Sequence, residues 1–127
     1  MTDDIDWGKY PNFAASEFKC RHCGKVDMKP EFMSLLQQLR TTYNKPMIIS
    51  SGYRCPDHPI EARKSKPGAH ASGQAADVAV QGTDAYEVLK IAFALGFSGI
   101  GVQQKGGGRF IHLDTLRSPP RPNVWSY

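Results

Sequence analysis

A histidine and an aspartate stand seven residues apart in the stretch GAHASGQAADVAV, residues 68–80. His70 lies among glycine, alanine and serine, whereas Asp77 interrupts an apolar run, residues 75–80, that is typical of a buried strand. A carboxylate at a buried position is costly unless it is paired, hydrogen-bonded or bound to a metal. Asp77 therefore indicates either a structural hydrogen bond or a place where a cation is held.

A second histidine and a second aspartate lie close together in the stretch RFIHLD, residues 109–114. Side chains alternate along a strand, so His112 and Asp114 share one face. If this strand lies beside the strand of Asp77, the side chains of His70, Asp77 and His112 can meet. Two imidazoles and one carboxylate are a common ligand set for catalytic zinc and leave a fourth position for water. The alternative is a structural histidine beside an Asp77 that binds a backbone N–H.

Two helices are predicted among the segments that position these residues. Apolar residues at helical spacing follow Pro30, which suits a first turn, and the pattern ends near residues 43–46. The second helix is expected to begin at a cap, Thr83 or Asp84, and to end at Gly96.

Short apolar runs bounded by glycine or proline predict the strands. They are expected over residues 47–50, 75–80, 100–103 and 109–114, with a glycine hairpin between the last two. A proline-rich tail, residues 118–122, is expected at the surface, and Trp125 after it is either a packing anchor or part of a cleft wall. This mixture favours an α+β fold, a single domain over residues 1–127 with helices packed on one side of a small, mostly antiparallel sheet.

Composition and charge limit the classes of protein to consider. The 127 residues are 40% hydrophobic and 22% charged, which suits a globular domain with a core of its own. The net charge of +4 comes from scattered lysines and arginines, apart from the run at residues 63–66. We expect that run to form a solvated face, which could steer an acidic polymer. Because basic and aromatic residues are not interleaved, we expect no nucleic-acid partner.

The sequence offers no segment that predicts membrane insertion or export. No apolar run approaches the roughly 20 residues needed to span a bilayer. The first residues are acidic and lack the apolar region of a signal peptide. We therefore expect the chain to be made and kept in the cytoplasm unless another factor releases it.

The three cysteines favour a second metal site over a disulfide framework, because their number is odd. Cys20 and Cys23 form a C-x-x-C pair, and Cys55 and His58 form a C-x-x-H pair. Together they supply three thiolates and one imidazole, a complete tetrahedral zinc site if the two loops meet. The alternatives are a disulfide from Cys55 to Cys20 or Cys23, or three buried thiols that simply pack.

Five strings occur in order along the chain: SGYRC at residues 51–55, HASGQAAD at 70–77, GIGVQ at 99–103, FIHLD at 110–114 and RPNVW at 121–125. In this order they resemble the zinc D-Ala-D-Ala carboxypeptidase-like murein peptidases, which share a fold with the Hedgehog signalling domain. The most specific part is the H-x-x-G-x-A-x-D string followed by the H-x-D strand. The resemblance covers most of the chain, residues 13–125.

The resemblance implies roles for the residues singled out above. His70, Asp77 and His112 would be the zinc ligands. Arg54 would point its guanidinium at the substrate carbonyl or terminal carboxylate, a task that suits a permanently charged, planar fork of donors. Zinc would polarise the scissile carbonyl and lower the pKa of its water to about 7.

Two positions depart from the family pattern. Related enzymes carry an acidic residue or a histidine shortly before the last zinc-binding histidine, as a general base, but residues 109–111 offer neither. Asp114 is the nearest candidate: either it takes the proton from water, or it orients His112 or an arginine. The family often has a serine where this chain has Gly68, and its loss removes one expected substrate contact.

The residues and the resemblance together predict a zinc metallopeptidase that hydrolyses stem or cross-link peptides of peptidoglycan, as a D-Ala-D-Ala-type carboxypeptidase or an endopeptidase. Tyr53 and Trp125 are expected to contact the peptide. The resemblance favours a monomeric lysis enzyme of a phage or prophage, released to the wall by a partner holin. The alternatives are a catalytically silent zinc-binding module that recognises wall or protein, and a structural component of a phage tail.

Overall fold

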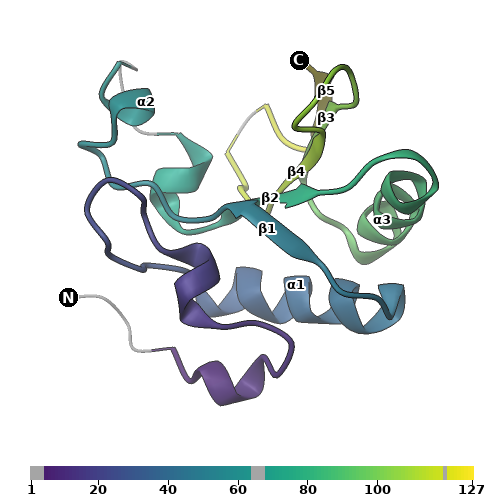
Figure 1. The fold of residues 1–127 in the computed structure, drawn as a ribbon, viewed down its shortest axis with the longest axis horizontal. Helices are drawn as coiled ribbons and strands as arrows, with labels where there is room; N and C mark the ends of the chain where they lie inside the picture. Colours follow the sequence, from purple (N-terminus) through teal and green to yellow (C-terminus); the bar gives the residue numbers. More distant parts are fainter. Residues whose placement is uncertain (1–4, 64–67, 119) are drawn as a thin grey trace.

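The computed structural model describes residues 5–63, 68–118 and 120–127 as a sheet with helices packed against it (Figure 1). The helical elements are η1 (Trp7–Lys9), η2 (Ala15–Phe18), α1 (Pro30–Tyr43), α2 (Pro59–Ala62), η3 (Ala69–Ser72) and α3 (Gly82–Leu95). The strands are β1 (Ile48–Ser51), β2 (Ala75–Ala79), β3 (Gly99–Gln103), β4 (Phe110–Asp114) and β5 (Asn123–Ser126). Of the basic run at residues 63–66, residues 64–66 lie outside the described part.

The five strands form one sheet in the order β1-β2-β4-β3-β5. All neighbours are antiparallel except β3 and β5, which run parallel. In the centre of the sheet Asp77 of β2 stands opposite His112 of β4, and His112 stands opposite Gly101 of β3. The register therefore brings the two predicted metal-binding strand residues together on one face.

The other face of the sheet carries the core. Alternate strand residues, such as Val78 of β2 and Ile111 of β4, are fully buried against α1 and α3. These two helices pack on each other and α3 also contacts β4, so both lie on one side of the sheet (Figure 1). The predicted α+β fold, with a mostly antiparallel sheet and helices on one side, is confirmed.

The helix ends follow local chemistry. Pro30 occupies the first turn of α1, and Asn44 ends that helix in the left-handed conformation. Gly96 ends α3 in the same conformation, as expected, but the predicted caps Thr83 and Asp84 are wrong. The helix begins earlier, at Gly82, so both residues lie inside its first turn.

The predicted strands match the observed ones to within one residue at each end, whereas β5 is missed. Residues 123–126 add a parallel edge strand to β3, after the proline-rich tail. Among the described residues no helix has the length and apolar character needed to cross a membrane.

Gly73 fixes the turn that carries His70 against the segment leading into α1. Its backbone has φ of +76°, and a Cβ added there would lie 2.1 Å from the carbonyl oxygen of Asp27. The carbonyl of Gly73 also accepts a hydrogen bond from the N–H of Lys29 at 2.9 Å. Both the left-handed conformation and the close backbone approach therefore require glycine.

We expect Gly73→Ala to destabilise the protein by about 1–3 kcal/mol or more, because it combines backbone strain with a clash against main-chain atoms. Denaturant unfolding measures this change. Gly107→Ala is the matched control, since a Cβ there meets open space, and it should alter stability by less than about 0.5 kcal/mol. Equal stabilities of the two variants would contradict this account of the turn.

Candidate metal centre

A cavity of about 420 Å³ opens on the face of the sheet opposite the helices. Its volume is within the range of small-molecule sites. It is lined by Arg54, Ile60, Ala69, His70, Asp77, Phe110, His112, Arg121, Trp125 and Tyr127. The lining thus combines two arginines, two histidines and one carboxylate with an aromatic wall.

Three side chains on the wall of this cavity offer ligand atoms that converge. His70, on η3, Asp77 and His112 are all buried, and one donor atom of each lies within 4.8 Å of the others. The Asp77 Oδ1 is 3.3 Å from His70 Nε2 and 3.1 Å from His112 Nδ1. The structure therefore brings together all three residues expected as zinc ligands.

Each histidine is oriented through the ring nitrogen that faces away from Asp77. His70 Nδ1 lies 2.7 Å from the carbonyl oxygen of Gly52, and His112 Nε2 lies 2.7 Å from Asp114 Oδ2. With a metal bound, an N–H donated to each of these acceptors would leave a lone pair on His70 Nε2 and on His112 Nδ1, both directed at the group of ligand atoms. This pairing of an outer acceptor with an inner lone pair is how metal-binding histidines are usually held. The donor set fits a divalent cation such as zinc.

The charges around the triad favour a cation at its centre. Burial alone raises the pKa of the Asp77 carboxyl, but hydrogen bonds and charges from His112 and His70 hold that pKa well below its usual range. Burial lowers the pKa of His112, whereas Asp114 and Asp77 raise it more strongly, so its net shift is upward. These opposite shifts are those of ionised carboxylates paired with a cationic imidazole, so Asp77 and Asp114 both favour positive charge on His112.

Asp114 lies behind His112 and is completely buried. Arg121 donates to both of its oxygens, from Nε at 2.9 Å and from a terminal nitrogen at 2.8 Å. Burial raises the pKa of Asp114, but hydrogen bonds from His112 and Arg121 bring it down to about 2. A Cβ on Gly99 of the neighbouring strand would lie 2.2 Å from this carboxylate, so the missing side chain makes room for it.

Arg54 reaches the cavity from the loop after β1. Its guanidinium lies 3.7 Å from Asp77 Oδ2 and 3.4 Å from Glu61 Oε2. Glu61 is buried, and its other oxygen accepts the N–H of Gly68 at 2.7 Å, just before the turn of His70. Glu61 therefore fixes both the arginine and the loop that leads to the first histidine.

The aromatic wall comes from the C-terminal strand. Trp125 of β5 lies 5.1 Å from the ring of His112, and Arg121 stacks 4.9 Å over the tryptophan ring. A Cβ on Gly101 would approach Trp125 Nε1 to 2.6 Å, so this glycine allows the indole to lie on the sheet. Of the two interpretations of Trp125, the structure supports the cleft wall.

Not every predicted site residue lies here. Tyr53 is packed in the core and is not part of the cavity lining. The sulfur atoms of Cys20, Cys23 and Cys55 form a separate group, within 4.8 Å of one another. His58 is not part of that group. Its Nδ1 accepts the N–H of Ile60 at 3.2 Å and caps α2.

Sequence reasoning missed three residues of the cavity and its support: Glu61, Arg121 and Tyr127. A signal existed for Arg121, since a buried Asp114 beside a histidine needs a further donor and the RPNVW string offers one. Glu61 gives no such signal, because it is an ordinary acidic residue in a proline-rich loop.

Comparisons with known proteins agree with this geometry. No curated protein matches the chain significantly. The model of the Peptidase M15 family matches residues 11–114, which include Arg54 and the three converging side chains His70, Asp77 and His112. Since this match covers most of the chain, the protein belongs to the Peptidase M15 family of metallopeptidases.

Proposed function

We propose that this protein is a zinc-dependent hydrolase of peptide bonds in peptidoglycan, acting on stem or cross-link peptides as a D-Ala-D-Ala-type carboxypeptidase or an endopeptidase. The observation that carries the proposal is the convergence of His70 Nε2, Asp77 Oδ1 and His112 Nδ1 at the wall of a cavity. Membership of the Peptidase M15 family supports it independently.

His70, Asp77 and His112 would hold the ion, and the residues that line the cavity would shape the place of reaction. A bound zinc ion supplies a Lewis acid that polarises a carbonyl and lowers the pKa of water to about 7. His70 and His112 keep their inner nitrogens directed at the metal because Gly52 and Asp114 fix their outer ones.

Arg54 binds the oxygen of the peptide on which negative charge develops, or the terminal carboxylate of a substrate cut at its end. Its guanidinium is held beside the ligand group by Asp77 and Glu61, so it does not need to reorganise during the reaction. Trp125 and Phe110 offer apolar surface that suits the small methyl side chains of alanine residues.

Asp114 is proposed to position His112 rather than to accept a proton from water. Both of its oxygens are already engaged by Arg121 and His112, and its side chain is inaccessible to the cavity. It is a second carboxylate behind a ligand, a place where such groups orient the imidazole and raise its basicity.

The remaining expectations stay predictions. These are a single domain over residues 1–127, a monomeric state, substrate contact by Tyr53, and a phage or prophage lysis enzyme made in the cytoplasm and released to the wall. The absence of a nucleic-acid or membrane partner is likewise a prediction of the sequence.

Mass spectrometry of purified peptidoglycan incubated with the protein tests the proposed function. We expect new peptide fragments that disappear when a chelator removes the metal and return when zinc is added back. Their masses identify the bond that is cut. Arg54→Gln should lower kcat/KM by about 100-fold, the usual effect of losing one donor to developing charge.

Arg117→Gln is the matched control, because the Arg117 side chain is 90% exposed and does not line the cavity. It should cleave at the rate of the unchanged protein. Absence of fragments from folded, zinc-loaded protein on walls of several chemotypes would overturn the proposal and favour the silent recognition module.

The variant Asp114→Asn distinguishes the two roles considered for Asp114, which are to position His112 and to accept a proton from water. If Asp114 positions His112, the variant should bind zinc about 10–100-fold more weakly and recover most activity at saturating zinc. Competition titration with a chromophoric chelator measures the affinity, and peptide release at several zinc concentrations measures the recovery. Unchanged zinc affinity with activity lost at every zinc concentration would instead show that Asp114 moves the proton.

A further inference from the structure

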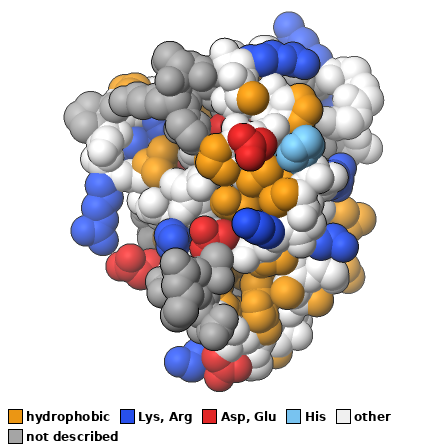
Figure 2. All heavy atoms as spheres, turned by 90° about the vertical axis from the view of Figure 1, so that its left-hand side faces the viewer, with side chains coloured by type: hydrophobic (Ala, Val, Ile, Leu, Met, Phe, Trp, Pro, Cys, Tyr) orange, Lys and Arg blue, Asp and Glu red, His pale blue; other side chains and the backbone are white. Residues whose placement is uncertain are grey.

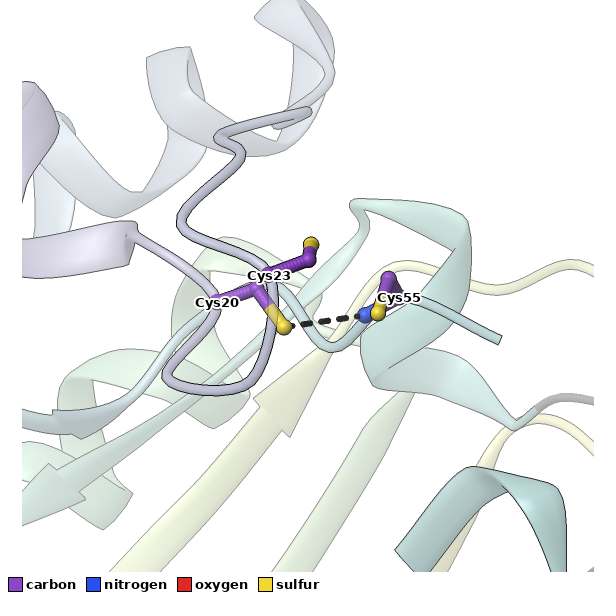
Figure 3. A group of neighbouring side chains, drawn as sticks. All are labelled: Cys20, Cys23 and Cys55. Atoms are coloured by element: carbon purple, nitrogen blue, oxygen red, sulfur yellow. Dashed lines mark hydrogen bonds between the residues drawn. The ribbon is translucent and has the colours of Figure 1, made fainter. Parts of the chain in front are cut away.

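Three cysteines meet at the junction of two loops, away from the cavity. Cys20 and Cys23 belong to the turn before residue 25, and Cys55 belongs to the loop after β1 (Figure 3). Their sulfur atoms lie within 4.8 Å of one another, and none forms a disulfide. Cys20 and Cys55 are buried, whereas Cys23 is exposed.

The turn of residues 20–25 is shaped to present sulfur ligands. The N–H of Gly24 donates to the carbonyl of Cys20 at 2.8 Å, and the N–H of Cys20 donates to the carbonyl of Lys25 at 2.8 Å. Gly24 has φ of +77°, which lets the chain fold back at this point. The two cysteines of the C-x-x-C pair are thereby held on the same side of the turn.

A backbone amide is directed at the Cys20 sulfur. The N–H of Cys55 donates to it at 3.3 Å, shown as the dashed line in Figure 3. Amide donors of this kind stabilise negative charge on sulfur, which is the form that binds metals. A thiol that merely packs in a core needs no such donors.

We propose that Cys20, Cys23 and Cys55 bind a second divalent ion of thiophilic character, such as zinc, as a structural site distinct from the cavity. Tetrahedral zinc binds each sulfur at about 2.3 Å, which places the sulfur atoms about 3.8 Å from one another. This separation is compatible with the three sulfur atoms observed here, which lie within 4.8 Å of one another. Binding releases the thiol protons to solvent and involves no redox step. The three sulfur atoms are the proposed ligands. A water molecule or an imidazole would occupy the fourth coordination position of the ion.

The position of this site gives it a structural role. The site joins the turn of residues 20–25 to Cys55. Cys55 directly follows Arg54, and the N–H of Arg54 donates to the carbonyl of His70 at 3.2 Å. Figure 2 shows the side of the molecule on which this turn and α2 lie, where apolar side chains reach the surface next to a histidine. An ion here would hold the loop that delivers Arg54 to the cavity.

Cobalt substitution of the reduced, full-length chain tests the proposal. Sulfur ligation gives a thiolate-to-cobalt charge-transfer absorption, which a site of two histidines and an aspartate does not give. We expect this absorption in the unchanged protein and its loss in Cys23→Ser, together with the loss of one metal equivalent per chain. Cys23 is the informative position because its exposed side chain has no packing role to lose.

Arg21→Ser is the matched control, since Arg21 is exposed on the same turn and carries no ligand atom. It should keep both the absorption and the metal. His112→Ala should keep the absorption too, which separates this inference from the proposed function. Absence of the charge-transfer band in reduced, folded protein, an unchanged metal content in Cys23→Ser, or a disulfide between two of the cysteines would each overturn the proposal.

Discussion

The site depends on one buried carboxylate held between two imidazoles. Asp77 projects from the interior strand β2 directly opposite His112 of the central strand β4, and the turn of η3 brings His70 to the same oxygen. Such a carboxylate is costly to bury unless charge or metal compensates it. The antiparallel register between β2 and β4 is therefore as important for the site as the identity of the ligands, because a shift of one residue would turn Asp77 into the core.

Polar partners continue outward from this centre in both directions. On one side His112 leads to Asp114 and then to Arg121, and on the other Asp77 leads to Arg54 and then to Glu61. Within the described part of the chain no buried side-chain nitrogen or oxygen lacks a hydrogen-bond partner. A polar network that is fully satisfied in this way holds its members in one geometry. That rigidity is what a site needs in order to keep ligands and Arg54 in place.

The convergence of His70, Asp77 and His112 and the α+β fold could be predicted from the sequence because both depend on local patterns. Alternation along the last predicted strand placed His112 and Asp114 on one face, and helical spacing after Pro30 indicated α1. The outer residues could not be predicted with the same ease. Arg121 reaches Asp114 only because the chain turns after β4 and returns as β5, an edge strand that the preceding prolines conceal. Tyr53 was expected to contact the peptide because it lies next to Arg54 in the sequence. Its side chain instead packs in the core.

The most direct measurement of the central claim is a crystal structure of the zinc-loaded protein with anomalous diffraction recorded on both sides of the zinc absorption edge. The account predicts an anomalous peak at the wall of the cavity, about 2.0–2.2 Å from His70 Nε2, Asp77 Oδ1 and His112 Nδ1. No anomalous peak at the cavity in the zinc-loaded crystal, with the two imidazoles still in direct contact with Asp77, would contradict the account, whether or not zinc is bound at the three cysteines.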